Sequence, residues 1–154
     1  MEIIDNHIYR SYISREHQCR KNIDSYKKIQ SDNLTKIAEF EGKIDSYHLQ
    51  IKEINFDIEV IEDPISRPLG TGQENKRIEI LIRQLESDVK KLESKIHLYQ
   101  SKLISVKMHI EEYERKIQQE KNHLVTLADS INKLIRNAIS HNDKYDKLQN
   151  IKSN

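Results

Sequence analysis

Seven histidines and one cysteine are the side chains with the widest chemical scope in this chain, because they can bind metal ions or act as nucleophiles. No two histidines stand three or four residues apart and no His-Glu-x-x-His motif occurs, so the usual helical spacing for a metal ion is missing. Cys19 falls at an apolar position of a heptad repeat, and no histidine or asparagine constellation marks it as a nucleophile. We therefore interpret Cys19 as a small core residue and expect no metal site, cofactor or catalytic residue.

Two further features could support chemistry. Glu16 and Glu120 both occupy heptad positions, and if they faced each other they could share a proton, as paired carboxylates do in hydrolases. However, a rod of two helices offers no cleft for a substrate. Gly70-Thr71-Gly72 lacks the lysine of a phosphate loop and follows no expected strand, so we interpret it as part of a connecting loop. The chain is expected not to be an enzyme.

Composition excludes several other classes of protein. The 154 residues are 33% charged with a net charge of +1, which gives no basic footprint for a nucleic acid. The longest apolar run is the three residues 80–82, so we expect no membrane insertion. Met1 leads into acidic residues rather than a basic and then apolar stretch, so no secretory signal is expected. A single cysteine cannot form an intrachain disulfide, which favours a reducing, cytoplasmic location.

The elements that must position all these side chains are two long helices. In residues 76–154, a positions taken every seven residues from Ile82 are all apolar or aromatic, and nine of eleven matching d positions from Ile78 are too. In residues 1–62, thirteen of sixteen a and d positions qualify, with Gln30 and Asn33 forming one polar layer. A 3.5-residue repeat sustained this long is specific for a coiled coil.

Four of the five Gly and Pro residues lie between Pro64 and Gly72, and Pro64 must end a helix. We therefore predict an all-α fold: helix over 1–62, a loop over 63–75 at the tip, and a helix over 76–154. Asn75 is a plausible N-cap for the second helix, within a residue or two.

Charge favours an antiparallel hairpin over a parallel dimer. If facing residue numbers sum to about 136, residues 39–60 with net charge −4 face 76–97 with net charge +2, and 10–28 with +4 face 108–126 with −1. Each exposed ion pair contributes little to stability, but the sum over all pairs sets the relative orientation of the two helices. That register places Glu16 against Glu120, and a slip of seven residues, to a sum near 143, relieves the repulsion. Both registers remain open from the sequence. The prediction is an elongated two-helix antiparallel coiled-coil hairpin with a C-terminal helical overhang.

Two apolar surfaces have no predicted partner within the hairpin. One lies near the loop and consists of Leu49, Phe56, Val60, Ile80 and Leu81, of which the first two are at outward f positions. The other is the overhang, where the apolar stripe continues through Ala138, Ile139, Tyr145, Leu148 and Ile151. Outward apolar clusters of this kind indicate docking, so these residues are the candidate partner-binding sites. All seven tyrosines also fall at a or d positions, and such bulky layers suggest that more than two helices meet, through homo-oligomerisation or a larger assembly.

These observations favour a non-enzymatic coiled-coil structural or adaptor subunit that holds partner proteins in a larger complex. A second hypothesis comes from the layout of the whole chain, which is expected to start as a helix, break near the middle and return in a longer helix. Its closest local feature is Lys76-Arg77-Ile78-Glu79-Ile80-Leu81-Ile82-Arg83-Gln84-Leu85, a basic, amphipathic restart after the break. With this restart, the layout of the whole chain resembles the stalk proteins of flagellar and type III secretion export ATPases. That resemblance implies a role in protein transport, with both chain ends entering an ATPase ring and the region near the break meeting the export gate. The resemblance is architectural, so no site residue is transferred. A third hypothesis is a helical chaperone whose apolar seam holds client helices.

Overall fold

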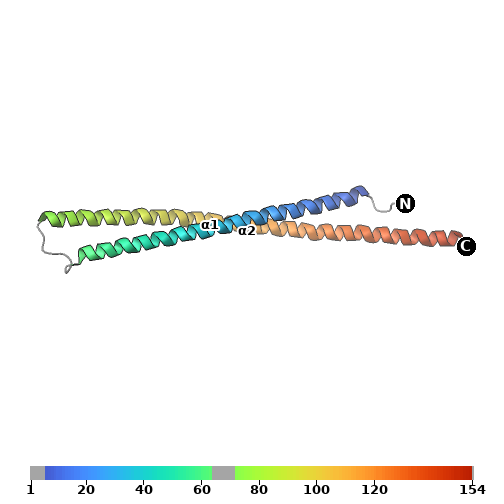
Figure 1. The fold of residues 1–154 in the computed structure, drawn as a ribbon. Coiled ribbons are helices and arrows are strands. Elements are labelled where there is room, and N and C mark those ends of the chain that lie inside the picture. The colour runs from blue at the N-terminus through green and yellow to red at the C-terminus, as the bar shows by residue number, and fades with distance from the viewer. Residues whose placement is uncertain (1–5, 64–71, 154) are drawn as a thin grey trace. The chain divides into compact units, whose positions relative to one another are not determined.

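The computed structural model describes residues 6–63 and 72–153, and within these ranges it contains two helices and no strand. Helix α1 spans Asn6–Glu62 and helix α2 spans Gly72–Ser153 (Figure 1). The two helices pack against each other as an antiparallel helical hairpin, which confirms the predicted fold class. None of the described helices is apolar enough over a sufficient length to cross a bilayer.

The helix boundaries follow local chemistry. Helix α1 ends one residue before Asp63, because a residue that precedes proline disfavours helical backbone angles. Helix α2 begins at Gly72, so the prediction of a start at residue 76 with Asn75 as N-cap is wrong. Residues 72–75 contain no proline, and Glu74 in the first turn is stabilised by the positive end of the helix dipole, which lets the helix start earlier. Most of the predicted loop, residues 64–71, lies outside the described residues.

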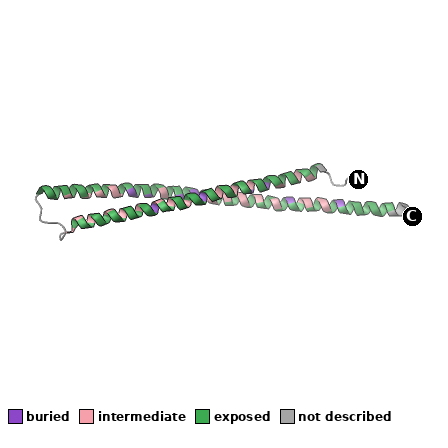
Figure 2. Ribbon diagram, in the orientation of Figure 1, coloured by how far each residue is buried: buried purple, intermediate pink, exposed green. Residues whose placement is uncertain are grey.

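The heptad assignment accounts for burial along both helices. All a and d residues from Tyr9 to Ile61 on α1, and from Ile78 to Ala138 on α2, are buried or half-buried (Figure 2). No described side chain is completely buried, as expected when only two helices meet. Gly42 lies on the outer surface with no side chain near it, in agreement with its f position. The apolar seam formed by the a and d residues therefore has its partner within the chain.

The chain divides into two compact units, each containing one segment of α1 and one of α2. In the unit formed by residues 32–109, Ile44, Ile96 and Leu103 make a buried cluster. Five partly buried side chains pack on this cluster: Ile37, Phe40, Tyr47, Ile51 and Tyr99.

Lysine ammonium groups lie over the rings in the aromatic layers of this unit. The ring of Tyr99 lies 5.6 Å from Phe40 and 5.9 Å from Tyr47, in tilted pairs. The ammonium groups of Lys43 and Lys102 lie 5.0 and 4.8 Å from the centre of the Tyr99 ring. The bulky d-position tyrosines Tyr47 and Tyr99 are thus accommodated, half-buried, between two helices.

The other unit is formed by residues 1–31 and 110–154. Its aromatic layer is the pair Tyr26–Tyr113, with ring centres 5.7 Å apart and Lys116 over the Tyr113 ring at 4.7 Å. Beside it, the Gln30 amide donates a 2.8 Å hydrogen bond to the backbone carbonyl of Ile110. A polar side chain in the seam is therefore satisfied by the facing helix, and this bond requires one particular alignment of the two helices.

The register is the slipped one of the two predicted alternatives. Facing residue numbers sum to 142 for Asn22–Glu120 and 139 for Tyr26–Tyr113 in one unit. In the other unit they sum to 142 for Lys43–Tyr99 and 146 for Tyr47–Tyr99. These four sums lie around 143 and not around 136. They scatter about that value because alternate contacts fall on either side of a layer.

Two sequence interpretations change with this register. Glu16 is bound by Arg20 at 3.0 Å and Glu120 by Asn22, so the two glutamates do not form the carboxylate pair considered above. Residues 39–60, at −4, now face 83–104, at +2, so opposite charges still meet there. Residues 10–28, at +4, face 115–133, also at +2, so the charge argument for their pairing is wrong. Apolar and aromatic contacts must stabilise that unit instead.

Candidate functional site

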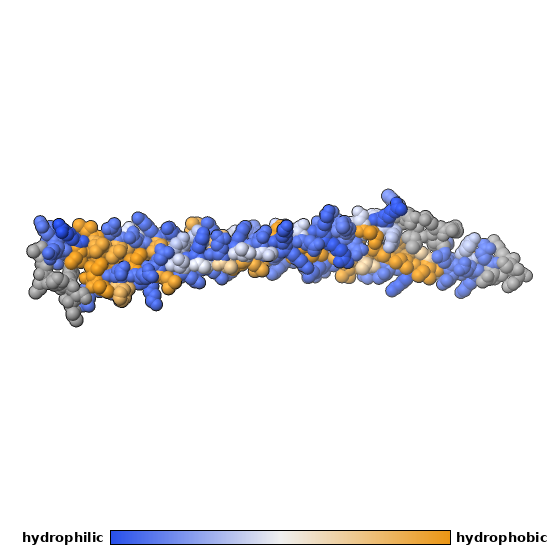
Figure 3. All heavy atoms as spheres, viewed as in Figure 1, coloured by the Kyte–Doolittle hydropathy of each residue, from blue (hydrophilic) through white to orange (hydrophobic). Residues whose placement is uncertain are grey.

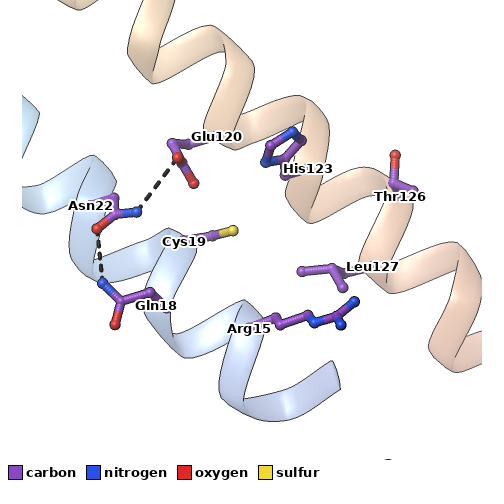
Figure 4. Close-up of a pocket in the computed structure, with 8 residues that line it drawn as sticks. All are labelled: Arg15, Gln18, Cys19, Asn22, Glu120, His123, Thr126 and Leu127. Atoms are coloured by element: carbon purple, nitrogen blue, oxygen red, sulfur yellow. Dashed lines mark hydrogen bonds between the residues drawn. The ribbon is translucent and has the colours of Figure 1, made fainter. Parts of the chain in front are cut away.

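Three side chains with metal-binding donor atoms meet in the unit that contains the chain ends. Cys19 of α1 points towards α2, where Glu120 and His123 flank it (Figure 4). The cysteine sulfur, a glutamate oxygen and a histidine nitrogen all lie within 4.8 Å of one another. Cys19 is buried, Glu120 is half-buried and His123 is exposed, so the group is reachable from solvent on its histidine side.

The heptad positions explain why these residues converge. Cys19 and Glu120 both occupy d positions, which point into the seam. His123 is three residues after Glu120 and therefore lies on the same helix face. In the observed register, Cys19 is level with residues 120–124, whereas a sum of 136 would have placed it level with Ile117. The spacing of the histidines alone does not reveal this cluster; its sequence signal is Glu120-x-x-His123, which lies opposite Cys19 only in the slipped register.

The three side chains border an open groove of about 400 Å³. The groove is lined by Arg15, Gln18, Cys19, Asn22, Glu120, His123, Thr126 and Leu127. A chain of hydrogen bonds holds the carboxylate in place: Gln18 donates to the Asn22 oxygen at 2.9 Å, and Asn22 donates to Glu120 at 3.5 Å. Glu120 is thus oriented by residues of the opposite helix.

The pKa of the Cys19 thiol is raised above its ordinary value. The largest cause is burial, followed by a hydrogen bond to Glu120 and the negative charge of that carboxylate. The thiol is therefore protonated at neutral pH, and a protonated thiol is a poor nucleophile. This electrostatic environment does not suit covalent catalysis by Cys19.

The predicted partner-binding residues near the loop are all exposed. Leu49 and Phe56 are 62% and 64% exposed, and Val60, Ile80 and Leu81 are exposed as well. Hydrophobic residues gather at the end of this unit where α1 ends and α2 begins (Figure 3). Two shallow grooves of about 360 and 410 Å³ adjoin Phe56, the one aromatic ring among these five residues. We call these five residues the loop-end cluster.

The C-terminal candidates divide into two groups. Ala138 is only 7% exposed, so it belongs to the covered seam and not to a free surface. Ile139, Tyr145 and Leu148 are exposed, as are all described side chains from 139 to 149. Ile151 lies beyond the residues whose side chains are described. The seam therefore ends at Ala138.

Further exposed apolar side chains were not among the candidates. They include Leu34, Leu98, Ile104, Met108 and Val125. These residues occupy heptad positions other than a and d, where some exposed apolar side chains are normal, and Ile104 and Met108 form an exposed pair four residues apart on one helix face. They provide matched controls for the loop-end cluster.

The chain was compared with protein-family models, with curated proteins and with solved structures, and none of the three comparisons gave a match.

Proposed function

We propose that the protein is a non-enzymatic coiled-coil subunit that binds partner proteins through surfaces outside its own seam. The observation that carries this proposal is the loop-end cluster, in which five large apolar side chains stay exposed although the a and d residues beside them are covered. Exposed apolar clusters on a helical surface bind partner helices or grooves of other proteins. An unpartnered cluster of this size would otherwise favour aggregation.

The covered seam supports an adaptor over a chaperone. A chaperone that used its a and d residues as a client groove would have to separate α1 from α2 before binding. Here those residues are covered by the chain itself from Tyr9 to Ile61 and from Ile78 to Ala138. The exposed surfaces that we propose for partners are the loop-end cluster and residues 139–149.

The first experiment removes the loop-end surface without touching the seam. Leu49→Ser/Phe56→Ser should leave helicity by circular dichroism within a few per cent of the wild type and abolish capture of partners in a pull-down with mass spectrometry. The matched control is Ile104→Ser/Met108→Ser, which replaces two side chains of closely similar exposure, 63% and 64%, in the same unit. Loss of partners in the control alone, or in neither variant, would contradict the proposal.

A second experiment tests the C-terminal surface. A chain shortened after Ser140 retains the complete covered seam but lacks Tyr145 and Leu148. If residues 139–149 bind a partner, this chain should lose that partner and keep those that depend on Leu49 and Phe56. A chain that keeps every partner would show that the last turns of α2 do not bind proteins.

The stalk of an export ATPase remains a second candidate because α2, with 82 residues, is longer than α1, with 57, and follows the break. That is the layout on which the resemblance rests. An ATPase stalk should raise the turnover of a hexameric export ATPase when added in trans. Unchanged turnover, measured with a chain whose helicity is verified, would leave the general adaptor as the proposed function.

A further inference from the structure

Cys19, Glu120 and His123 are not among the exposed apolar residues of the proposed function, and they meet in one cluster. We propose that these three side chains form a binding site for one divalent transition-metal ion of the type of Zn²⁺ or Co²⁺, which links α1 to α2. The site supplies one sulfur, one nitrogen and one oxygen donor from two helices. This mixture suits Zn²⁺ and Co²⁺ better than the harder ions Mg²⁺ and Ca²⁺, which require oxygen ligands. The inference is independent of the proposed function.

The three donor atoms need to move only slightly closer together to bind one ion. Zinc binds sulfur at about 2.3 Å and nitrogen or oxygen at about 2.0–2.2 Å, so donors of a tetrahedral site lie roughly 3.3–3.8 Å apart. The three donor atoms already lie within 4.8 Å of one another without an ion. Because His123 is exposed, its ring can turn towards the sulfur without displacing packed neighbours.

The surroundings favour a bound ion in two further ways. Asn22 donates a hydrogen bond to Glu120, and such contacts orient a ligand before the metal arrives. The open groove leaves room for water in the fourth coordination position. On binding, the Cys19 S–H bond is replaced by a sulfur–metal bond, and the thiol proton passes to solvent.

The ion would connect the two helices of its unit at a point where charge does not help them to pair. Residues 10–28 and the facing residues 115–133 both carry a positive net charge. One ligand comes from the first segment and two from the second. Binding is therefore expected to stabilise the pairing, because the folded form alone brings the three ligands together.

The first test titrates the full chain with Co²⁺ under a phosphine reductant. We expect one ion per chain, a sulfur-to-cobalt charge-transfer band and the strong visible bands of tetrahedral cobalt. Cys19→Ser should abolish the charge-transfer band, and His123→Gln and Glu120→Gln should each weaken binding about tenfold or more. His141→Gln, which removes an exposed histidine outside the cluster, should bind cobalt as the wild type does.

The second readout is thermal unfolding with and without Zn²⁺. Zinc should raise the unfolding midpoint of the wild type and of His141→Gln, and should raise that of His123→Gln clearly less at the same zinc concentration. His123 is exposed, so its replacement should not unfold the metal-free chain. Absence of the cobalt bands, binding unaffected by the three ligand variants, or one ion shared by two chains would overturn the proposal.

Discussion

Replacement of Ile96 by alanine tests the heptad seam directly. Ile96 is 5% exposed and belongs to the buried cluster with Ile44 and Leu103. Truncation of a buried isoleucine to alanine costs about 2–5 kcal/mol, including the cavity left behind. Since no side chain in this seam is completely buried, neighbours and water can fill part of the space. The expected loss is therefore at the lower end, about 2–3 kcal/mol.

Urea unfolding followed by circular dichroism gives the measurement. With a slope of about 2 kcal/mol per molar urea, the midpoint should fall by about 1–1.5 M. Ile104→Ala is the matched control, because Ile104 is the same residue type on the same helix but is 63% exposed. Alanine has a higher helix propensity than isoleucine, so the control should change stability by no more than about 0.5 kcal/mol. Equal losses in the two variants would refute the assignment of the seam.

Three further outcomes are expected. Gln30→Leu removes the hydrogen bond to the Ile110 carbonyl and should raise the urea midpoint of unfolding. It should also allow other registers or oligomers, which sedimentation would detect. A single unchanged species would show that Gln30 does not set the alignment of the two helices. The pKa of Tyr99 is lowered, mainly by its 3.1 Å hydrogen bond with Lys43, so one tyrosine should ionise early in an ultraviolet titration and lose this behaviour in Lys43→Met. Because the folded chain favours the phenolate, Tyr99 should stabilise the folded chain only as pH rises towards 10.0, the ordinary pKa of a phenol. Chemical unfolding of the wild type and of Tyr99→Phe at several pH values would measure this difference in the free energy of unfolding.

The fold could be predicted because the apolar residues of the seam recur in the sequence at a fixed spacing. The heptad repeat places Ile44, Ile96 and Leu103 at a positions, and all three are buried. Leu49 and Phe56 were assigned to the outer face, and both are exposed. A period of 3.5 residues determines which side chains point inward, and this property needs no knowledge of the partner helix.

The register could not be predicted in the same way. A slip of seven residues keeps every a and d residue in the seam, so apolar burial differs little between the two alternatives. Specific contacts decide between them, such as the bond of Gln30 to a backbone carbonyl of α2 and the packing of Tyr26 on Tyr113. Residue charges summed over windows indicated the wrong pairing for residues 10–28, because exposed charges contribute little beside such contacts.

The end of burial at Ala138 divides α2 into parts of unequal stability. Residues 141–149 keep their helical hydrogen bonds but expose every side chain, and a helix this short without packing is marginal in water. Its amide protons can exchange with solvent through local opening of the last turns, while those of the covered seam require separation of the two helices. A protein that docks on Tyr145 and Leu148 must therefore supply the free energy that holds this segment helical, so its association is coupled to a local helix–coil equilibrium.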